Sequence, residues 1–195
     1  MSTPGAEAED ILAFWFGAPV EGATPERNKL WFTKSADTDQ LIRSRFLDVH
    51  EQAKNGALVH WLDAPRSCLA FILVTDQFPR NLFRETPAAF ATDTLALGAA
   101  RHALEQGFDR RLQPIERVFL YLPFEHSEDG TDQARAVALF DALRAEGDMD
   151  GFYQYALAHQ RIIERFGRFP HRNAILGRAS SPEEIEFLKE PGSRF

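Results

Sequence analysis

Cysteine, lysine, tryptophan and tyrosine are all scarce in this chain of 195 residues, which has one, four, three and three of them. The single thiol, Cys68, excludes a disulfide within the chain and fits a reducing compartment. Because Cys68 lies in the apolar run 68–74, we expect it to be buried and unreactive. The N-terminus lacks the apolar core of a signal peptide, and no apolar run approaches the roughly 18 residues that span a bilayer. We therefore expect a cytoplasmic protein with no membrane partner.

The chain also has fewer basic than acidic residues, 22 against 29. The formal net charge of −7 argues against a general nucleic-acid-binding protein, which would normally be basic. The eighteen arginines far outnumber the lysines, and arginine suits bidentate recognition of carboxylate or phosphate. A GC-rich genome would produce the same bias. An apolar content of 44% with seventeen phenylalanines predicts one large aromatic core.

Helix signals occur along the whole chain, and the alternating pattern of strands is scarce. Thr24-Pro25, Thr86-Pro87 and Ser181-Pro182 each read as an N-cap followed by proline at the first helical position. Ser181 with Glu184 also fits a capping box. Glycines 56, 107, 147 and 167 each follow a helical stretch, where a left-handed cap is favoured. We expect helices near 7–16, 37–55, 65–78, 87–106, 114–123, 132–146, 152–166 and 182–189.

These helices predict an all-α fold in a single domain of residues 1–195, with 1–6 and 191–195 loose. The runs 68–74 and 118–124 are apolar on all sides, as in central, buried helices. Pro79, Pro123 and Pro170 follow one another at intervals of 44 and 47 residues, the range of paired-helix repeats. The spacing favours an α–α superhelix of stacked antiparallel helical hairpins.

Three polar segments, each beside one of these prolines, carry the unusual chemistry of the chain. The first runs from Asp76 to Arg84. Pro79 cannot continue a regular helix and disfavours helical angles at Phe78, so we expect the buried helix to end or kink there. Asp76 would then lie at a helix C-terminus, where the helix dipole disfavours a negative charge. It needs a cationic partner, and Arg80 and Arg84 are the candidates.

The second segment, 123–128, holds Glu125, His126 and Glu128, a dense titratable group that could act as acid, base or ligand. The third, 165–178, is rich in arginine within an acidic chain. His159 lies in the apolar stripe of the helix 152–166. It could be a core histidine whose hydrogen bonds are satisfied, or a functional residue.

If the segments converge, their six arginines outnumber their three acids, and the site would favour an anion such as a carboxylate or phosphate. The candidate catalytic residues are Glu125, His126 and His159. The candidate ligand-binding residues are Asp76, Arg80, Asn81, Arg84, Arg165, Arg168, His171, Arg172 and Arg178. The alternative is structural, with the arginines capping helix ends and pairing with nearby acids.

Other chemistries find less support. The histidines and acids are suitable metal ligands, but no histidine pair at i,i+4 and no cysteine pattern is present, so we expect no metal. Ser127 adjoins His126 without a nucleophile-elbow motif. No glycine-rich phosphate loop occurs, and we expect no cofactor.

The same segments resemble those of a known family. Asp-Gln-Phe-Pro-Arg-Asn-x-Phe-Arg (76–84), Leu-Pro-Phe-Glu-His-Ser-Glu (122–128) and Arg-Phe-Gly-Arg-Phe-Pro-His-Arg-Asn (165–173) are similar to the signatures of the bacterial "domain of unknown function 924" family. So are the opening Ile-Leu-x-Phe-Trp-Phe and the tail from Leu176 to Leu188, although Ser180-Ser181 replaces the usual Ser-Thr pair. The resemblance implies a tetratricopeptide-like α–α superhelix, without the tetratricopeptide consensus, and implies no activity.

Two functional hypotheses follow. In the first, the arginines hold a small anionic molecule, with Glu125 and His126 as acid–base groups and His159 behind them. In the second, the protein is a scaffold that binds a protein or peptide along a concave helical face, and the polar segments lock the helix ends. The first is slightly favoured, because scaffolds seldom concentrate so many titratable groups near helix ends, and the tryptophan and tyrosine that would favour the second are scarce. The sequence sets neither an oligomeric state nor a reaction.

Overall fold

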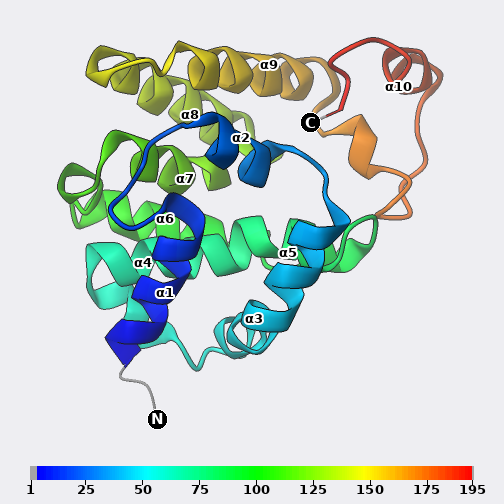
Figure 1. Cartoon of the computed structure of the whole chain (residues 1–195). Coiled ribbons are helices and arrows are strands. Elements are labelled where there is room, and N and C mark those ends of the chain that lie inside the picture. The colour runs from blue at the N-terminus through cyan, green and yellow to red at the C-terminus, as the bar shows by residue number, and fades with distance from the viewer. Residues whose placement is uncertain (1–3, 195) are drawn as a thin grey trace. The chain divides into compact units, whose positions relative to one another are not determined.

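The computed structural model describes residues 4–194, with side chains from Glu7 onward, and Figure 1 shows its helices. Every regular element in this range is a helix, so the prediction of an all-α protein is confirmed. None of the described helices has the length and apolarity needed to cross a membrane. The chain divides into two compact units, and each is described by itself. The expectation of a single domain stays a prediction.

Unit 1 comprises the chain up to Arg84 together with Ala88–Pro123. Its α-helices are α1 (Pro4–Phe16), α2 (Pro25–Phe32), α3 (Ala36–Lys54), α4 (Pro65–Ile72), α5 (Phe78–Leu82), α6 (Asp93–Glu105) and most of α7 (Pro114–Glu125). Its shorter elements are η1 (Val59–Asp63), the π-helix η2 (Leu73–Gln77), η3 (Pro87–Phe90), which begins one residue before Ala88, and η4 (Asp109–Arg111).

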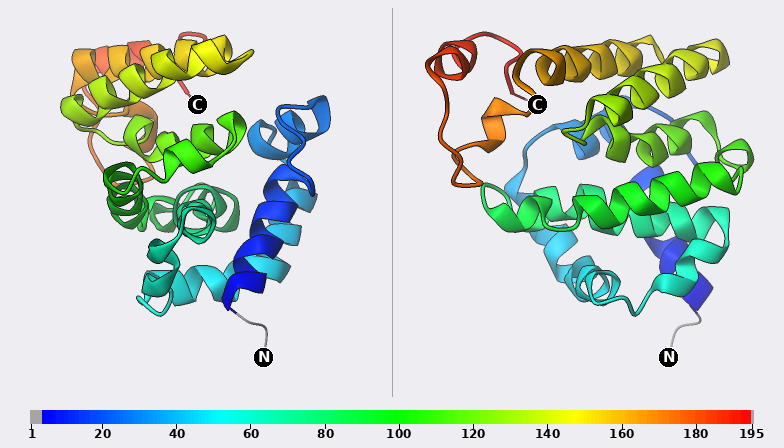
Figure 2. Two further views of the ribbon diagram at one scale, coloured as in Figure 1. Left: turned by 90° about the vertical axis from the view of Figure 1, so that its left-hand side faces the viewer. Right: turned by 180° about the vertical axis from the view of Figure 1, so that it is seen from behind.

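Unit 2 comprises Glu85–Pro87 and the described chain from Phe124 onward, so it begins within the last turn of α7. Its helices are α8 (Gly130–Leu143), η5 (Arg144–Glu146), α9 (Asp150–Phe166), η6 (Pro170–Arg172) and α10 (Pro182–Phe187). The short connection through η5 folds α9 back along α8, and the two lie side by side (Figures 1 and 2).

Aromatic rings fill the core of unit 1. The ring of Trp15 lies 5.5 Å from that of Phe78 and 5.6 Å from that of Phe119, both edge-on, the arrangement that aromatic quadrupoles favour. The runs 68–74 and 118–124 are buried throughout, as their apolar sequences predict. Burial raises the pKa of Cys68 to about 12, so its thiol is unreactive.

The helix through the first polar segment differs from the prediction. It neither ends at Pro79 nor displaces Phe78, whose backbone keeps helical angles (φ −61°, ψ −38°). Instead, α4 passes into the π-helix η2 and then into α5, and the Phe78 N–H donates to the Leu73 carbonyl five residues back. The wider π turn makes room for a proline ring that would clash in a regular helix. Asp76 therefore lies inside a continuous helix and not at its C-terminus.

Three side chains satisfy the carbonyl groups around this π turn. The Nδ1 atom of His50 lies 2.8 Å from the Val74 carbonyl oxygen, and the Thr92 hydroxyl donates to the Thr75 carbonyl at 2.6 Å. The guanidinium of Arg80 donates to the Asp76 carbonyl. Because unsatisfied buried carbonyls are costly, these donors allow the helix to run through Pro79.

Two other boundaries differ from the sequence-based expectation. The polar helix α2 was not predicted as a helix because only Trp31 in it is buried, although its N-cap Thr24 and Pro25 behave as expected. The predicted helix 87–106 divides into η3 and α6. The division lies beside Thr92, whose backbone leaves α-helical angles (φ −109°, ψ 7°) while its hydroxyl binds Thr75.

In unit 2, α9 buries a stripe that includes Ala156, His159 and Ile163, as its periodicity predicts. A stripe at helical spacing on 152–166 would also include Tyr155, but that prediction is wrong, because the exposed fraction of Tyr155 is 62%. The helix ends at Gly167, whose φ of 68° is the left-handed conformation that glycine adopts at no steric cost.

The expectation of loose termini falls partly outside the described residues, which exclude 1–3 and 195. Residues 4–6 form the first turn of α1. Near the C-terminus, Ser193 is buried within a turn and its hydroxyl donates to the Leu188 carbonyl at 3.2 Å.

Replacing Thr92 by valine should destabilise the protein by about 1–3 kcal/mol, because the buried Thr75 carbonyl loses its hydroxyl donor while the side-chain shape is nearly kept. Thr94→Val, made two residues away on the exposed face of α6, should change stability by less than about 0.5 kcal/mol. Urea unfolding of both variants measures the difference. Equal effects would show that the Thr92 hydroxyl does not support the π turn.

Candidate functional site

The first polar segment forms a set of ion pairs within unit 1. Asp76 is fully buried. Its carboxylate accepts a hydrogen bond from the side-chain amide of Gln77 at 2.6 Å and pairs with Arg80 at 3.3 Å. Arg80 also binds both carboxylate oxygens of Asp93, at 3.0 and 3.2 Å. Asp93 is the first residue of α6, where the helix dipole also favours a negative charge. Arg80 is therefore the partner that Asp76 was expected to need.

Arg84 and Asn81 both bind Asp39, in the first turn of α3. The guanidinium of Arg84 reaches the two carboxylate oxygens at 2.8 and 2.6 Å, and the Asn81 amide donates at 2.8 Å. Burial by itself raises the pKa of Asp39, but the hydrogen bonds from Arg84 and Asn81 outweigh it and leave that pKa below its ordinary value. Asp39 is thus held as a carboxylate between two helices.

The arginines at the end of α9 pair with the first turn of α10. Arg165 contacts Glu183 at 2.9 Å, while Arg168 binds both carboxylate oxygens of Glu184 at 2.7 and 2.8 Å. Glu184 is also the third helical residue of a capping box, in which it accepts the Ser181 N–H and donates its own N–H to the Ser181 hydroxyl. The hydrogen bonds from Arg168 lower the pKa of Glu184 to about 2.

Glu128 joins the second and third polar segments. Its carboxylate binds the Arg178 guanidinium at 2.6 and 2.9 Å and accepts the backbone N–H of Phe169 at 2.8 Å. Arg178 also donates to the Phe169 carbonyl and to the Asn173 side chain. Burial raises the pKa of Glu128, yet these donors outweigh it and leave the pKa lowered. This one carboxylate therefore fixes the loop after α9.

His159 is buried against the end of α7. Its Nδ1 atom lies 2.9 Å from the Tyr155 carbonyl and 3.2 Å from a carboxylate oxygen of Glu125. Since a carbonyl oxygen can only accept, Nδ1 carries the proton and Nε2 is the acceptor nitrogen. Burial, reinforced by His126 and Arg172, lowers the pKa of His159 to about 3 despite the hydrogen bond to Tyr155. The imidazole is therefore neutral near pH 7.

Phe169 and its neighbours complete a group that we call the His–Arg cluster, which consists of His126, His159, His171 and Arg172. The Arg172 guanidinium lies 4.5 Å from the centre of the Phe169 ring, and the His159 and His171 rings lie 5.5 and 5.7 Å from the same ring. The His126 ring lies 6.4 Å from that of His159. Burial and the adjacent Arg172 lower the pKa of His171 to about 4, so this imidazole is neutral as well.

The predicted site residues therefore fall into two groups. The second and third segments meet in unit 2, where Glu128 binds Arg178 and the backbone N–H of Phe169, and Glu125 of the second segment contacts His159 of α9. The first segment lies in unit 1, and its convergence with the others stays a prediction. Most of the predicted arginines bind carboxylates of the chain itself, as the structural alternative expects. Among the described residues, no group of three or more histidine, cysteine or acidic side chains is placed to hold a metal ion.

Sequence reasoning missed the residues that complete these pairs. Asp39 follows the start of a predicted helix and Asp93 falls inside one, and neither was singled out, while Glu184 was identified only as part of a capping box. The sequence also did not indicate that the ring of Phe169 contacts Arg172 and two imidazoles. No local pattern indicates such pairings, because the partners are far apart in the sequence.

Comparisons with known proteins agree with this architecture. The family described as "Bacterial protein of unknown function (DUF924)" matches residues 11–192. A solved structure of a protein of unknown function from Agrobacterium tumefaciens is similar, with 42% sequence identity and a TM-score of 0.85. The similarity covers 96% of this chain and 99% of that chain. A comparison with curated protein sequences gives no match.

Replacing Glu184 by glutamine should cost about 1–3 kcal/mol of unfolding free energy at pH 7, because Arg168 then loses its charged partner. The folded pKa of about 2 lies below the ordinary 4.5, so the wild-type advantage is complete above pH 4.5 and is lost as the pH falls toward 2. Urea unfolding at pH 7, 4.5 and 3 measures the difference in unfolding free energy between the wild type and the Glu184→Gln variant, which should shrink as the pH falls.

Glu186→Gln provides the matched control on the same helix. The Glu186 side chain is 71% exposed and pairs with Lys189 at 2.6 Å, a surface pair that contributes little. A pH-independent cost for Glu184→Gln, or an equal cost for both variants, would show that the Arg168 pair does not stabilise this end of the protein.

Proposed function

Since the chain belongs to DUF924, a bacterial family of unknown function, we propose an activity from its own side chains: it binds a small anionic molecule that carries a carboxylate or phosphate. The binding site is the His–Arg cluster of unit 2. The observation that supports it is Arg172, which has an exposed fraction of 7% and stacks on Phe169 beside two imidazoles kept neutral by burial and positive charge.

The electrostatics of the cluster favour an anion. Burial is the main reason why the pKa values of His159 and His171 are low, and the positive charge of Arg172 lowers both further. A bound anion would offset that charge and the histidines would then take up protons more readily. Proton uptake on binding is therefore a signature of this site that a simple surface ion pair would lack.

The arginines first considered as ligands have a different role in this proposal. Arg168 and Arg178 fix the segments on either side of the cluster through Glu184 and Glu128. Arg80 and Arg84 likewise hold helix ends through carboxylates, and Arg165 forms an exposed pair with Glu183. The structural alternative thus accounts for these five arginines, while Arg172 and the three histidines form the binding group.

Binding is better supported than catalysis. Glu125 and the Tyr155 carbonyl hold His159 in one tautomer, with Nε2 as the acceptor. A base with a pKa of about 3 is poorly matched to proton abstraction near pH 7. A catalytic role for Glu125, His126 and His159 would require the bound anion to raise that pKa first.

A helical scaffold is the second proposal, together with a tetratricopeptide-like superhelical arrangement and a cytoplasmic location. Large apolar side chains are exposed on separate elements, with exposed fractions of 57% for Phe32, 58% for Val59 and 62% for Tyr155. Single exposed apolar residues are common, so this support is weaker. Under this proposal Tyr155→Ser would abolish partner binding, whereas anion binding would be unchanged.

Sulfate is the most direct probe of the anion site, because it resembles phosphate and does not titrate in this pH range. Calorimetric titration at pH 6.5 should show saturable sulfate binding in a background of chloride at matched ionic strength. The observed heat should differ between buffers of different ionisation enthalpy, because the histidines take up protons. Acetate in a parallel titration shows whether a carboxylate is preferred.

Arg172→Met should abolish this binding, and His171→Gln should weaken it about tenfold, the effect of losing one charge-assisted hydrogen bond. His60→Gln, on an exposed histidine of unit 1, should leave binding unchanged. Retained circular dichroism and unfolding midpoints show that the variants fold. Undiminished binding by a folded Arg172→Met variant would remove the proposed site.

A further inference from the structure

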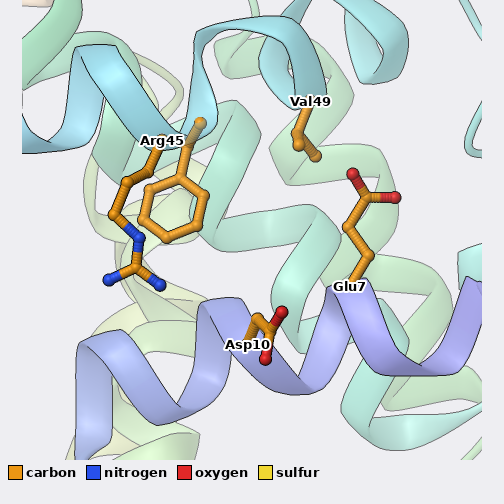
Figure 3. Close-up of a pocket in the computed structure, with 5 residues that line it drawn as sticks. Glu7, Asp10, Arg45 and Val49 are labelled. Carbon is orange, nitrogen blue, oxygen red and sulfur yellow. The ribbon is translucent and has the colours of Figure 1, made fainter. Parts of the chain in front are cut away.

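Unit 1 contains a separate open pocket of about 390 Å³, which Figure 3 shows at close range. Glu7 and Asp10 of α1 line one side, and Arg45, Phe46 and Val49 of α3 line the other. This volume is within the range of about 300–1,000 Å³ for small-molecule sites. None of these five residues belongs to the three polar segments.

Arg45 differs from the arginines of the polar segments in its contacts. Its guanidinium lies 5.0 Å from the centre of the Phe14 ring and 4.7 Å from that of Phe46. Within residues 7–194, Arg45 forms neither an ion pair nor a hydrogen bond. Two aromatic rings therefore position the cation without using its N–H donors.

The acids on the opposite helix are also available. Glu7 and Asp10 are one helical turn apart on α1, so both face the pocket, and in the described part of the chain neither forms an ion pair. Two carboxylates and one guanidinium thus border the same space. Phe46 and Val49, with exposed fractions of 4% and 5%, add an apolar surface between them.

We propose that this pocket binds a small zwitterion, an amino acid with an apolar side chain. Glu7 and Asp10 would bind its ammonium group, and Arg45 would bind its carboxylate in a bidentate pair. The apolar side chain would lie against Phe46 and Val49. The two carboxylates would repel a simple anion, and Arg45 would repel a simple cation. A molecule that carries both charges therefore fits the lining best.

The experiment is an NMR titration of the full chain with L-leucine, L-leucinamide and N-acetyl-L-leucine, which carry both charges, only the positive charge and only the negative charge. We expect saturable shifts in α1 and α3 with L-leucine, and binding at least about tenfold weaker for each derivative, since each loses one charged hydrogen-bonding group. Equal binding of all three compounds, or no binding of leucine, would overturn the proposal.

Matched variants test the assigned roles. Arg45→Met keeps an unbranched side chain of similar length beside the rings and removes the guanidinium charge, and Asp10→Asn removes one carboxylate. Each variant should weaken leucine binding about tenfold. Asp48→Asn changes an exposed acid of α3 outside the pocket and should have no effect. Leucine binding that is unchanged in a folded Arg45→Met variant would also overturn the proposal.

Discussion

Bidentate pairing between an arginine and a carboxylate on another element is the interaction on which the rest of this structure depends. Arg84 with Asp39, Arg168 with Glu184 and Arg178 with Glu128 each join parts of the chain that are distant in sequence. The planar guanidinium fixes the angle as well as the distance of such a contact, which lysine would not do. These three pairs therefore use a geometry that arginine provides and lysine does not.

These arginine–carboxylate pairs also determine which side chains remain available to bind a ligand. Arg178 and Glu128 fix the loop that carries Phe169, and this ring is the surface on which Arg172 stacks. Burial, together with this guanidinium, keeps His171 and His159 in the neutral state. Burying a charge beside rings that would otherwise protonate costs free energy, which a bound anion would offset.

Local signals in the sequence predicted the ends of several helices. The Ser181 capping box and the left-handed Gly167 are both present as expected, because caps depend on residues within one turn. The helix through Pro79 was not predictable in this way. Its carbonyls are satisfied by His50 and Thr92, which come from other helices, and no local pattern reports donors supplied by tertiary structure.

The candidate site was likewise only partly predictable from the sequence. The residue types and their crowding near helix ends pointed to Glu128, His159, Arg172 and Arg178, but not to the way they are paired. Arg172 and Arg168 look alike in the sequence, four residues apart, yet one stacks on a ring in the interior and the other binds Glu184. Which arginine stabilises the fold and which could bind a ligand depends on contacts made after folding.

In the proposed anion site, burial and the charge of Arg172 keep His171 neutral until an anion binds. The most direct measurement is the pKa of the His171 ring, followed by NMR across pH 3–8 with and without saturating sulfate. We predict a value near 4 without sulfate and a clear upward shift with it. A His171 pKa that is the same in both titrations would contradict the account.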